Sequence, residues 1–458
     1  MPTFLLPLDP VTSLDGYLAT GGRAGVENAQ RIGPAETIET ITRSGLRGRG
    51  GGGFPTGRKW AGIASQTGTR RYLVCNGAEG EPGTFKDRAL LRANPYQFVE
   101  GVIIAAFAIG ADEAFICLKA NFEREIEAVT RAVQEMQSAG ICTDCTVNIV
   151  AGPDEYLFGE EKAMLEVIEG KPPLPRWFPP YEHGLFAAGP QEGWESGTGR
   201  PRGTGPNPTL VNNVETLSNV PHILANGADW FRSMGTAESP GTIVATVVGD
   251  VVAPDVGEVE LGTPLRAVID AVGSGVHPGR AVKAVFSGVA NPVVTADQLD
   301  VPVSYEGFTA VGSGMGAAGF IVYDDTACMV DAAYRMSRFL YIESCGQCPP
   351  CKLGSGEITS LLERIETGAG EDTDVARIEA WLDRVTDGNR CYLAVEERLV
   401  VGSVLRAFGD EFVEHIERHA CPRPERRPIP KLLDLANGVA TYDERFWSKQ
   451  PDWTYADT

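Results

Sequence analysis

Residues 71–150 decide the fold, because short apolar runs alternate there with longer helical segments. The runs 71-RYLVC-75, 114-AFICL-118 and 147-VNIV-150 have the length and residue types of buried strands. Between them, 95-PYQFVEGVIIAAFAIGA-111 predicts a buried helix and 123-EREIEAVTRAVQEM-136 an amphipathic one. A strand–helix alternation of this kind is typical of an α/β core whose sheet is largely parallel.

Length and charge limit the classes of protein to which the chain can belong. The 458 residues are enough for about three domains, and the net charge of -21 repels nucleic-acid phosphates. The N-terminal residues have no basic start followed by an apolar run, which argues against a signal peptide. The longest apolar stretch, residues 101–111, is well short of the ~20 residues of a spanning helix. We therefore expect a cytoplasmic protein that binds no nucleic acid and does not itself insert into a membrane.

Before the core, a helix interrupted at Gly33-Pro34 is expected over residues 27–43. After it, the Pro- and Gly-rich residues 172–208 predict an extended surface loop. Short β-type runs between residues 241 and 324, with one helix at 263–272, predict a second, smaller α/β domain.

The last part of the chain has helical periods and predicts a bundle. Helices are expected over residues 331–341, 358–365, 375–385 and 396–416. Residues 421–430, rich in Pro and Arg, predict a linker to a tail that lies on the surface.

The strongest chemical signal is 345-CGQCPPC-351, with a fourth cysteine at Cys391. Three thiolates at C-x2-C-x2-C spacing, completed by a distant fourth, suit the corners of a [4Fe–4S] cluster. Structural zinc is the rival, but it usually takes two separated ligand pairs, and no second pair lies near Cys391 in the sequence. Buried free cysteines are the remaining alternative.

The other cysteines and the histidines give weaker signals. Cys142 and Cys145 form an isolated CxxC that is either structural or redox-active. No partner spacing is seen for Cys75, Cys117, Cys328 and Cys421. The five histidines form no cluster in the sequence, so none is assigned as a metal ligand or base.

The second signal is the glycine-rich run 45-GLRGRGGGGFPTGRKW-60. Gly48, Gly50 and Gly53 satisfy G-x-G-x-x-G, but a predicted helix precedes them and Pro55 follows, which is not the strand–turn–helix setting of a dinucleotide fingerprint. Consecutive glycines still let several N–H groups point at one anion. The run therefore predicts a site for a phosphate-bearing cofactor, with a mobile loop as the alternative.

The third signal is 76-NGAEGEPGTFKDR-88, which directly follows the strand ending at Cys75. In open α/β sheets, ligands bind at loops that follow the carboxyl ends of strands. The runs 156-YLFGEE-161 and 211-VNNVET-216 have a similar mixture of amides, carboxylates and small residues. A solvated turn is the alternative for each of them.

Taken together, these motifs resemble those of the NADH-binding flavoprotein subunit of respiratory complex I. Their order and spacing match from about Tyr17 to about Phe412. The β subunits of NAD-dependent formate dehydrogenases and the diaphorase subunits of NAD-reducing hydrogenases are similar and carry the same motifs. The resemblance implies FMN, NAD(H) and one [4Fe–4S] cluster as cofactors.

The resemblance also implies a domain organisation. It places a Rossmann-like FMN- and NAD(H)-binding α/β domain at residues 1–240 and a small ubiquitin-like (SLBB) α/β domain at 241–325. A helical bundle carrying the cluster would follow at 326–420, with the tail at 421–458.

Carried over residue by residue, the resemblance implies two groups of contacts and no catalytic acid or base. The contacts to FMN are Gly48, Arg49, Gly50, Gly51, Lys59, Asn76, Glu79, Gly159, Glu160, Val211, Asn212, Asn213 and Thr216. The contacts to the nucleotide are Phe54, Glu81 and Glu161. The cluster ligands are Cys345, Cys348, Cys351 and Cys391.

The chain departs from the family at several positions of this pattern. Ala78 stands where an Asp is usual, Gly62 where a Phe is usual, and Lys162 where a Thr is usual. Tyr181 takes the place of another aromatic residue of the adenine pocket. Residues 187–207 form an insertion between two of the motifs.

The function that follows from the resemblance is that of an oxidoreductase subunit. Hydride would pass between NAD(H) and FMN, and single electrons would pass through the cluster to or from partner subunits. The chain has no thioredoxin-like [2Fe–2S] module, so a small subunit of that type and a larger iron–sulfur or catalytic subunit are the expected partners. Formate, hydrogen and quinone remain open as the terminal electron donor or acceptor.

Two alternatives belong to other functional classes. The chain could carry the cluster as an electron-transfer or scaffold subunit without nucleotide turnover of its own. It could also be a zinc-stapled assembly protein.

Overall fold

The computed structural model describes residues 2–66, 70–142, 145–187, 205–423 and 425–456. The chain divides into two compact units, each built from discontinuous segments. The first unit comprises residues 1–79, 86–244 and 257–262, and the second comprises residues 80–85, 245–256 and 263–458.

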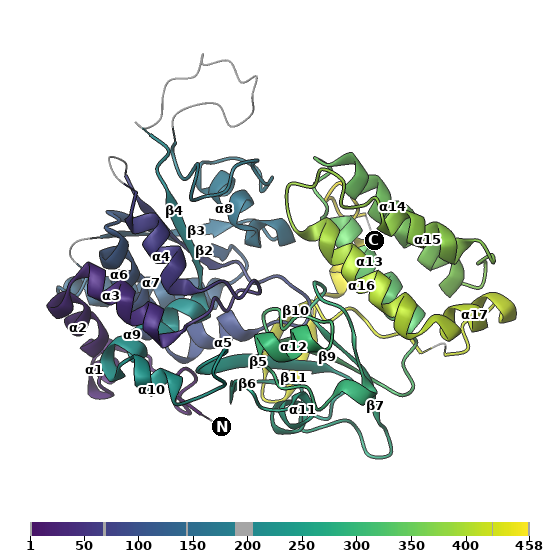
Figure 1. Ribbon diagram of the computed structural model, residues 1–458, viewed down its shortest axis with the longest axis horizontal. Helices are drawn as coiled ribbons and strands as arrows, with labels where there is room; N and C mark the ends of the chain where they lie inside the picture. The colour runs from purple at the N-terminus through teal and green to yellow at the C-terminus, as the bar shows by residue number, and fades with distance from the viewer. Residues whose placement is uncertain (1, 67–69, 143–144, 188–204, 424, 457–458) are drawn as a thin grey trace, which may run out of the picture. The chain divides into compact units, whose positions relative to one another are not determined.

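The first unit is built on a four-stranded parallel sheet (Figure 1). Its strands are β1 (Tyr72–Gly77), β2 (Glu113–Lys119), β3 (Thr146–Gly152) and β4 (Thr209–Asn213), in the order β3-β2-β1-β4. All three pairings are parallel, which confirms the α/β core and parallel sheet predicted from residues 71–150. The parallel register sets Asn76 at the end of β1 opposite Asn213 at the end of β4.

Helices make up most of the rest of this unit. They are α1 (Leu14–Ala19), α2 (Ala24–Ile32), α3 (Pro34–Ser44), α4 (Thr56–Ala64), α5 (Lys86–Ala93), α6 (Pro95–Ile109), α7 (Glu123–Ser138), η1 (Tyr156–Gly159), α8 (Glu161–Ile168), α9 (Val214–Asn226) and α10 (Ala228–Arg232). The predicted interruption at Gly33-Pro34 is confirmed, since α2 ends before Gly33 and Pro34 begins α3. Gly33 has a φ of 86°, which explains why a glycine separates the two helices.

Apolar side chains pack against the sheet of this unit. The predicted buried helix α6 is the most apolar helix, and nearly all of its residues are buried. Another cluster joins Tyr72 and Val74 of β1 to Phe158 of η1 and to Met164 and Leu165 of α8. Packing of these segments against the strands holds η1 and the start of α8 beside the sheet.

The second unit contains a mixed five-stranded sheet, in the order β6-β5-β9-β7-β8. Its strands are β5 (Thr242–Gly249), β6 (Asp255–Glu260), β7 (Val282–Ser287), β8 (Val294–Thr295) and β9 (Gly319–Asp324). β5 pairs with β9 in parallel, whereas β7 is antiparallel to both β8 and β9. The helical elements between these strands are α11 (Leu265–Gly273), η2 (Ala296–Gln298) and α12 (Tyr305–Ala310). Residues at the start of β5 and in most of β6 cluster with the first unit.

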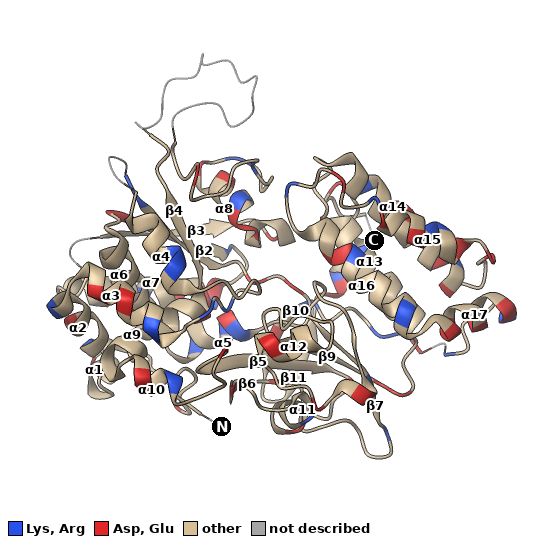
Figure 2. Cartoon of the chain, viewed as in Figure 1, with Lys and Arg blue, Asp and Glu red and all other residues tan. Residues whose placement is uncertain are grey.

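From residue 329 to residue 418 the chain is largely helical, as predicted. The helices are α13 (Met329–Glu343), α14 (Pro349–Glu366), α15 (Asp374–Leu382), α16 (Leu393–Ala407) and α17 (Gly409–Arg418). The prediction of one helix over 396–416 is wrong. The helix is interrupted at Phe408, whose backbone leaves the helical region, so that α16 and α17 are separate helices. In Figure 2, acidic residues, coloured red, are distributed over many helices, in keeping with the net charge of -21.

The segment after residue 421 is only partly the surface-lying tail that its composition predicted. It forms β10 (Leu432–Ala436), β11 (Val439–Tyr442) and η3 (Glu444–Ser448). Phe446 is buried, and buried Lys449 forms an ion pair with buried Glu343 of α13, with 2.9 Å between Nζ and Oε1. Within the described part of the chain, no helix is long and apolar enough to cross a bilayer.

Candidate functional site: a polar cavity and a cysteine loop

The glycine-rich run forms a closed loop between two helices. It follows the end of α3, and the Gly48 N–H donates to the carbonyl of Phe54 at 2.9 Å while the Thr56 N–H donates to the carbonyl of Leu46 at 2.9 Å. The Arg47 guanidinium donates to the carbonyl of Gly53 at 2.8 Å. The predicted difference from a strand–turn–helix fingerprint is therefore confirmed, and the loop is held across its base.

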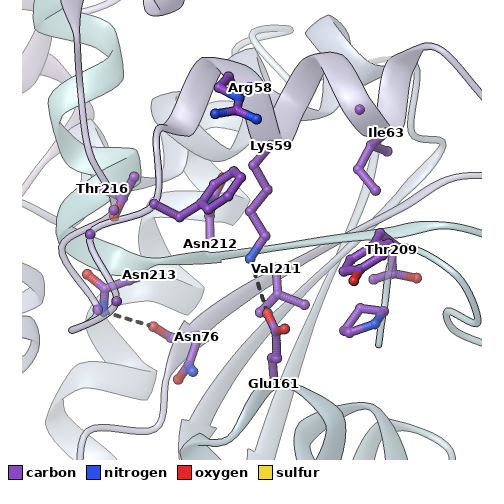
Figure 3. Close-up of a pocket in the computed structure, with 18 of the residues that line it drawn as sticks. Arg58, Lys59, Ile63, Asn76, Glu161, Thr209, Val211, Asn212, Asn213 and Thr216 are labelled. Atoms are coloured by element: carbon purple, nitrogen blue, oxygen red, sulfur yellow. Dashed lines mark hydrogen bonds and ion pairs between the residues drawn. The ribbon is translucent and has the colours of Figure 1, made fainter. Parts of the chain in front are cut away.

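Two strand ends bring asparagine side chains to the same edge of the sheet. Asn76 Nδ2 donates to the carbonyl of Gly159 at 2.7 Å, which ties the end of β1 to η1. Asn213 Nδ2 donates to the carbonyl of Asn76 at 3.4 Å, the contact drawn in Figure 3. The buried Trp60 indole donates to Asn212 Oδ1 at 2.7 Å and so links α4 to β4. Parallel pairing thus unites motifs that are far apart in sequence.

A buried cluster of charged side chains fixes the side chain of Asn213. Lys86 Nζ lies 2.7 Å from Asp87 Oδ1, 3.1 Å from Glu215 Oε2 and 3.1 Å from Asn213 Oδ1. Burial alone lowers the pKa of Lys86, but the surrounding carboxylates outweigh it and raise the pKa above its ordinary value. Burial raises the pKa of Asp87 to about 6, against the opposing effect of Lys86. Asn213 is therefore fixed by a lysine and by Asp87, whose Oδ2 accepts from its Nδ2 at 2.7 Å.

These elements surround a cavity of about 630 Å³, a volume typical of cofactor sites. Twelve of the sixteen residues predicted as flavin or nucleotide contacts line it: Gly48, Gly50, Phe54, Lys59, Asn76, Gly159, Glu160, Glu161, Val211, Asn212, Asn213 and Thr216. Nine further residues complete the lining: Gly52, Gly53, Arg58, Gly62, Ile63, Gln66, Pro180, Tyr181 and Thr209. Some of these, such as Arg58 and Gly52, are sequence neighbours of predicted contacts, which is the signal that could have identified them.

Lys59 and Glu161 point toward each other across this cavity (Figure 3). Lys59 Nζ lies 3.1 Å from Glu161 Oε2, and the two side chains are 29% and 37% exposed. The cavity therefore offers a cation and a carboxylate, both accessible to a ligand. Arg58 adds a second cation, with its guanidinium 5.7 Å from the centre of the Phe54 ring.

Glu160 has a different role from its neighbour. Its carboxylate caps the start of α8 and accepts from the N–H groups of Lys162 and Ala163, each at 2.9 Å. Burial raises its pKa to about 7, although Lys162 and the two backbone N–H groups favour the ionised form. Glu160 thus titrates near neutral pH at the wall of the cavity.

Four of the sixteen predicted contacts are not among the described residues that line the cavity: Arg49, Gly51, Glu79 and Glu81. Gly51 belongs to the same loop, and Arg49 is fully buried, with its N–H donating to Thr216 Oγ1 at 2.8 Å and its guanidinium to the carbonyl of Pro240 at 3.2 Å. Glu79 is buried in an ion pair with Arg88 at 3.0 Å. Glu81 clusters with the second unit, where its Oε1 accepts from the Val289 N–H at 3.0 Å.

The positions that depart from the family pattern lie mostly at this cavity. Gly62 lines it, and no atom lies within 4 Å of the place where a Cβ at Gly62 would stand. Tyr181 also lines the cavity and is half exposed. Ala78 is buried. The insertion at 187–207 falls mainly outside the described residues.

The cysteine motif lies on the loop between α13 and α14. Gly346, with a φ of 77°, reverses the chain between Cys345 and Cys348, and Cys348 directly precedes the first turn of α14. The Arg390 N–H donates to Cys348 Sγ at 3.4 Å, so the segment bearing Cys391 reaches this loop. Burial raises the pKa of the Cys351 thiol to about 11. Cys391 precedes α16 rather than lying within a helix.

Comparison with known protein families identifies two matching regions. Residues 41–222 match the family described as the Nuo51 FMN-binding domain. Residues 331–415 match the NADH-ubiquinone oxidoreductase-F iron-sulfur binding region. The first match includes the cavity, and the second includes the cysteine motif.

Curated proteins resemble the chain over nearly its whole length. The NADH-quinone oxidoreductase F 2 subunit of Rhizobium meliloti is 38% identical over 421 residues, 89% of this chain and 96% of that protein. The corresponding F subunit of Streptomyces coelicolor is 38% identical, covering 90% of each chain. HndC, an NADP-reducing hydrogenase subunit of Solidesulfovibrio fructosivorans, is 35% identical, covering 91% of this chain and 83% of that one.

A solved structure has the same fold. The crystal structure of an NAD+-reducing [NiFe]-hydrogenase in its H2-reduced state matches with a TM-score of 0.75 and 32% identity. The match covers 91% of this chain and 68% of the hydrogenase chain.

Proposed function

This chain belongs to the family of NADH-quinone oxidoreductase F subunits and related hydrogenase subunits, and from that membership we propose how its residues carry out electron transfer. It is an oxidoreductase subunit that uses NAD(H), FMN and a [4Fe–4S] cluster. Its relatives are subunits of larger oxidoreductases, and it works in the same kind of assembly. The roles of individual residues, the partners and the domain boundaries are our proposals.

We propose that the 630 Å³ cavity holds FMN, and the observation that carries this is the convergence of distant polar motifs on it. The glycine loop, the end of β1, the start of α8 and the end of β4 all contribute to its wall. A Cβ at Gly52 would meet no atom within 4 Å, so a ligand can approach the backbone there. Lys59 supplies a cation suited to a phosphate. The residues present thus fit a phosphate-bearing, ring-containing cofactor.

Within this cavity we assign binding roles and no acid–base role. The backbone of Gly48 and Gly50, together with Lys59, holds the phosphate and ribityl chain. The amides of Asn76, Asn212 and Asn213, held by the hydrogen bonds described above, orient the ring through its polar edge. Phe54 and Glu161 contact the nucleotide, with the carboxylate accepting from ribose hydroxyls. When bound, a flavin accepts a hydride and releases its two electrons singly, which links a two-electron donor to a one-electron cluster.

We propose that Cys345, Cys348, Cys351 and Cys391 ligate the [4Fe–4S] cluster. The spacing of the first three and the approach of residue 390 to Cys348 support this assignment. The partners that would exchange electrons with a cluster held there are a small thioredoxin-like [2Fe–2S] subunit and a larger iron–sulfur or catalytic subunit. We place the assembly in the cytoplasm, where any membrane attachment is made through partner subunits.

For the second unit we retain the division suggested by the resemblance. The mixed sheet of β5–β9 with α11 supports a ubiquitin-like SLBB domain over residues 241–325. Helices α13–α17 then form the cluster domain, 326–420. Residues 421–458 form the tail, and residues 1–240 form the FMN and NAD(H) domain.

The test is reduction of ferricyanide by NADH, using the full chain purified with its flavin and iron. We expect flavin and cluster absorbance together with NADH-dependent reduction. A protein that holds both cofactors but does not oxidise NADH would be the scaffold or electron-transfer subunit instead. A protein that holds neither cofactor would overturn the proposal.

A variant pair tests the cavity assignment within the same assay. Lys59→Met removes the cation from the cavity wall, so flavin content is expected to fall at least several-fold. Lys171→Met is the matched control, because Lys171 is half exposed, pairs with Glu166 and Glu169, and lies outside the cavity lining. Equal flavin content in the two variants would contradict the role of Lys59.

A further inference from the structure

Four potential ligands meet in the second unit, away from the cysteine loop in sequence. They are Cys328 at the start of α13, Glu366 at the end of α14, His415 near the end of α17, and Cys421 just beyond it. Their ligand atoms all lie within 4.8 Å of one another. Cys328, Glu366 and His415 are buried and Cys421 is half-buried. Sequence spacing gave no reason to join them, since Cys328 and His415 are 87 residues apart.

The separations within this group match those of a tetrahedral metal site. His415 Nε2 lies 3.3 Å from Cys328 Sγ and 3.3 Å from Glu366 Oε2, and Cys328 Sγ lies 3.5 Å from the same Glu366 oxygen. Zinc binds sulfur at about 2.3 Å and nitrogen or oxygen at about 2.0–2.2 Å, so its tetrahedral ligands stand about 3.3–3.8 Å apart. Three of the four corners therefore already have the spacing of a zinc site.

The hydrogen bonds around His415 orient it as a ligand. Its Nδ1 lies 2.6 Å from the carbonyl oxygen of Glu411 in the preceding turn of α17. A carbonyl oxygen only accepts, so Nδ1 carries a hydrogen, and in the neutral ring the lone pair of Nε2 is then available to a metal ion between Cys328 and Glu366. Metal-bound histidines are usually fixed in this way by a second partner on the other ring nitrogen.

The charges around the group balance a bound dication. Two thiolates and one carboxylate with Zn²⁺ leave a net charge of about -1. Arg426 contacts Glu366 Oε1, and its NH1 lies 3.7 Å from Cys421 Sγ. Arg426 thus places a positive charge beside the group, shared with Asp331 at 3.6 Å, while Glu366 Oε2 faces His415 and Cys328.

We propose that Cys328, His415, Cys421 and Glu366 bind one zinc ion, a second metal site distinct in its ligands from the cysteine loop. Thiolate and imidazole ligands in a closed, buried group favour zinc in a structural role. The ion joins the start of α13, the end of α14 and the end of α17 to the first residues of the segment that leads to β10. It therefore fixes the direction in which the chain leaves the helices.

The experiment measures zinc and iron by mass spectrometry in the full chain, purified without chelators from cells supplied with both metals. The wild type is expected to contain about one zinc besides about four irons. Cys421→Ser is expected to lose most of the zinc and keep the iron, whereas Cys348→Ser is expected to keep the zinc and lose iron. Cys145→Ser, a half-buried cysteine of the first unit, is the control and should keep both.

Two further measurements keep the test decisive if a variant folds poorly. X-ray absorption at the zinc edge of the wild type should give two sulfur and two nitrogen or oxygen neighbours. Alkylation and peptide mass analysis of the wild type should find Cys328 and Cys421 as separate thiols once zinc is removed. A wild type with full iron but no zinc, a Cys421→Ser variant that retains zinc, or a Cys328–Cys421 disulfide would each overturn the proposal.

Discussion

Gly51 and Gly52 are adjacent in the glycine loop, yet the structure predicts that valine acts differently at the two positions. Gly51 has a φ of 110°, a conformation that side-chain-bearing residues rarely adopt. Gly52 has no such constraint, and its added Cβ would meet no atom within 4 Å. Gly52 lines the cavity, whereas Gly51 is not among the described residues that do so.

The expected effects follow from these two observations. Gly51→Val strains the backbone at this position, so the free energy of unfolding should fall by about 1–3 kcal/mol. At about 2–4 °C for each kcal/mol, this lowers the melting temperature of the flavin-free protein by about 2–12 °C. Gly52→Val leaves the free energy of unfolding within about 0.5 kcal/mol of wild type. Its side chain instead occupies space that the cofactor needs, so FMN affinity falls at least tenfold, or about 1.4 kcal/mol.

The assay combines thermal unfolding of the flavin-free protein with titration by FMN, followed through flavin fluorescence. Gly140→Val provides the matched control, because Gly140 has a φ of 70° and an open surrounding but lies outside the cavity lining. It should lose stability and keep FMN affinity. Wild-type FMN affinity in Gly52→Val would refute the placement of the cofactor in this cavity. Equal melting temperatures of Gly51→Val and Gly52→Val would refute the argument from backbone strain.

Three other predictions concern the cluster, the nucleotide and pH. Cys348→Ser replaces a soft ligand by a hard one, so iron content and the reduced-state EPR signal should fall while FMN binding survives; full iron content would contradict the assignment. Glu161→Gln removes the carboxylate that repels the 2′-phosphate of NADPH. The NADH/NADPH ratio of kcat/KM should then narrow by about ten- to a hundredfold, chiefly through NADPH, whereas exposed Glu127→Gln should leave it unchanged. Burial raises the pKa of Glu160 from 4.5 to about 7. Between pH 4.5 and pH 7, therefore, Glu160 is protonated in the folded protein and ionised in the unfolded chain. The free energy of unfolding then falls as the pH rises through this range. In urea unfolding, the free energy of unfolding of Glu160→Gln should fall by about 1–3 kcal/mol less than that of the wild type between pH 5 and pH 8. The same pH dependence in variant and wild type would contradict the raised pKa of Glu160.

The parallel sheet could be predicted from sequence because three of its strands, β1, β2 and β4, are largely buried on both faces. Residues 72–75 and 114–118 are therefore continuous apolar runs, and the long apolar helix α6 lies between them. The break at Phe408 was missed because apolar residues keep their helical spacing across it. The burial of Lys449 was missed because it depends on Glu343, a partner 106 residues away.

The candidate site was predictable where local sequence determines the position of a side chain. Asn76 and Asn213 follow strands, and parallel strands end at one edge, so their meeting could be expected. The buried pair of Glu79 and Arg88 could not, because an exposed loop and a buried ion pair have the same residue types. The approach of His415 to Cys328 depends on how three helices pack, which no spacing in the sequence encodes.

The discontinuous division of the chain constrains the order in which it can fold during synthesis. Residues 80–85 are made early but cluster with the second unit, and residues 257–262 are made late but cluster with the first. The first unit is therefore incomplete until residue 262 has emerged from the ribosome, well after the strands of its parallel sheet have been synthesised. Residues 80–85 must wait still longer for their neighbours in the second unit. A fragment cut at residue 240 would therefore lack residues 241–244 and 257–262 of the first unit, and would keep residues 80–85 without their neighbours in the second.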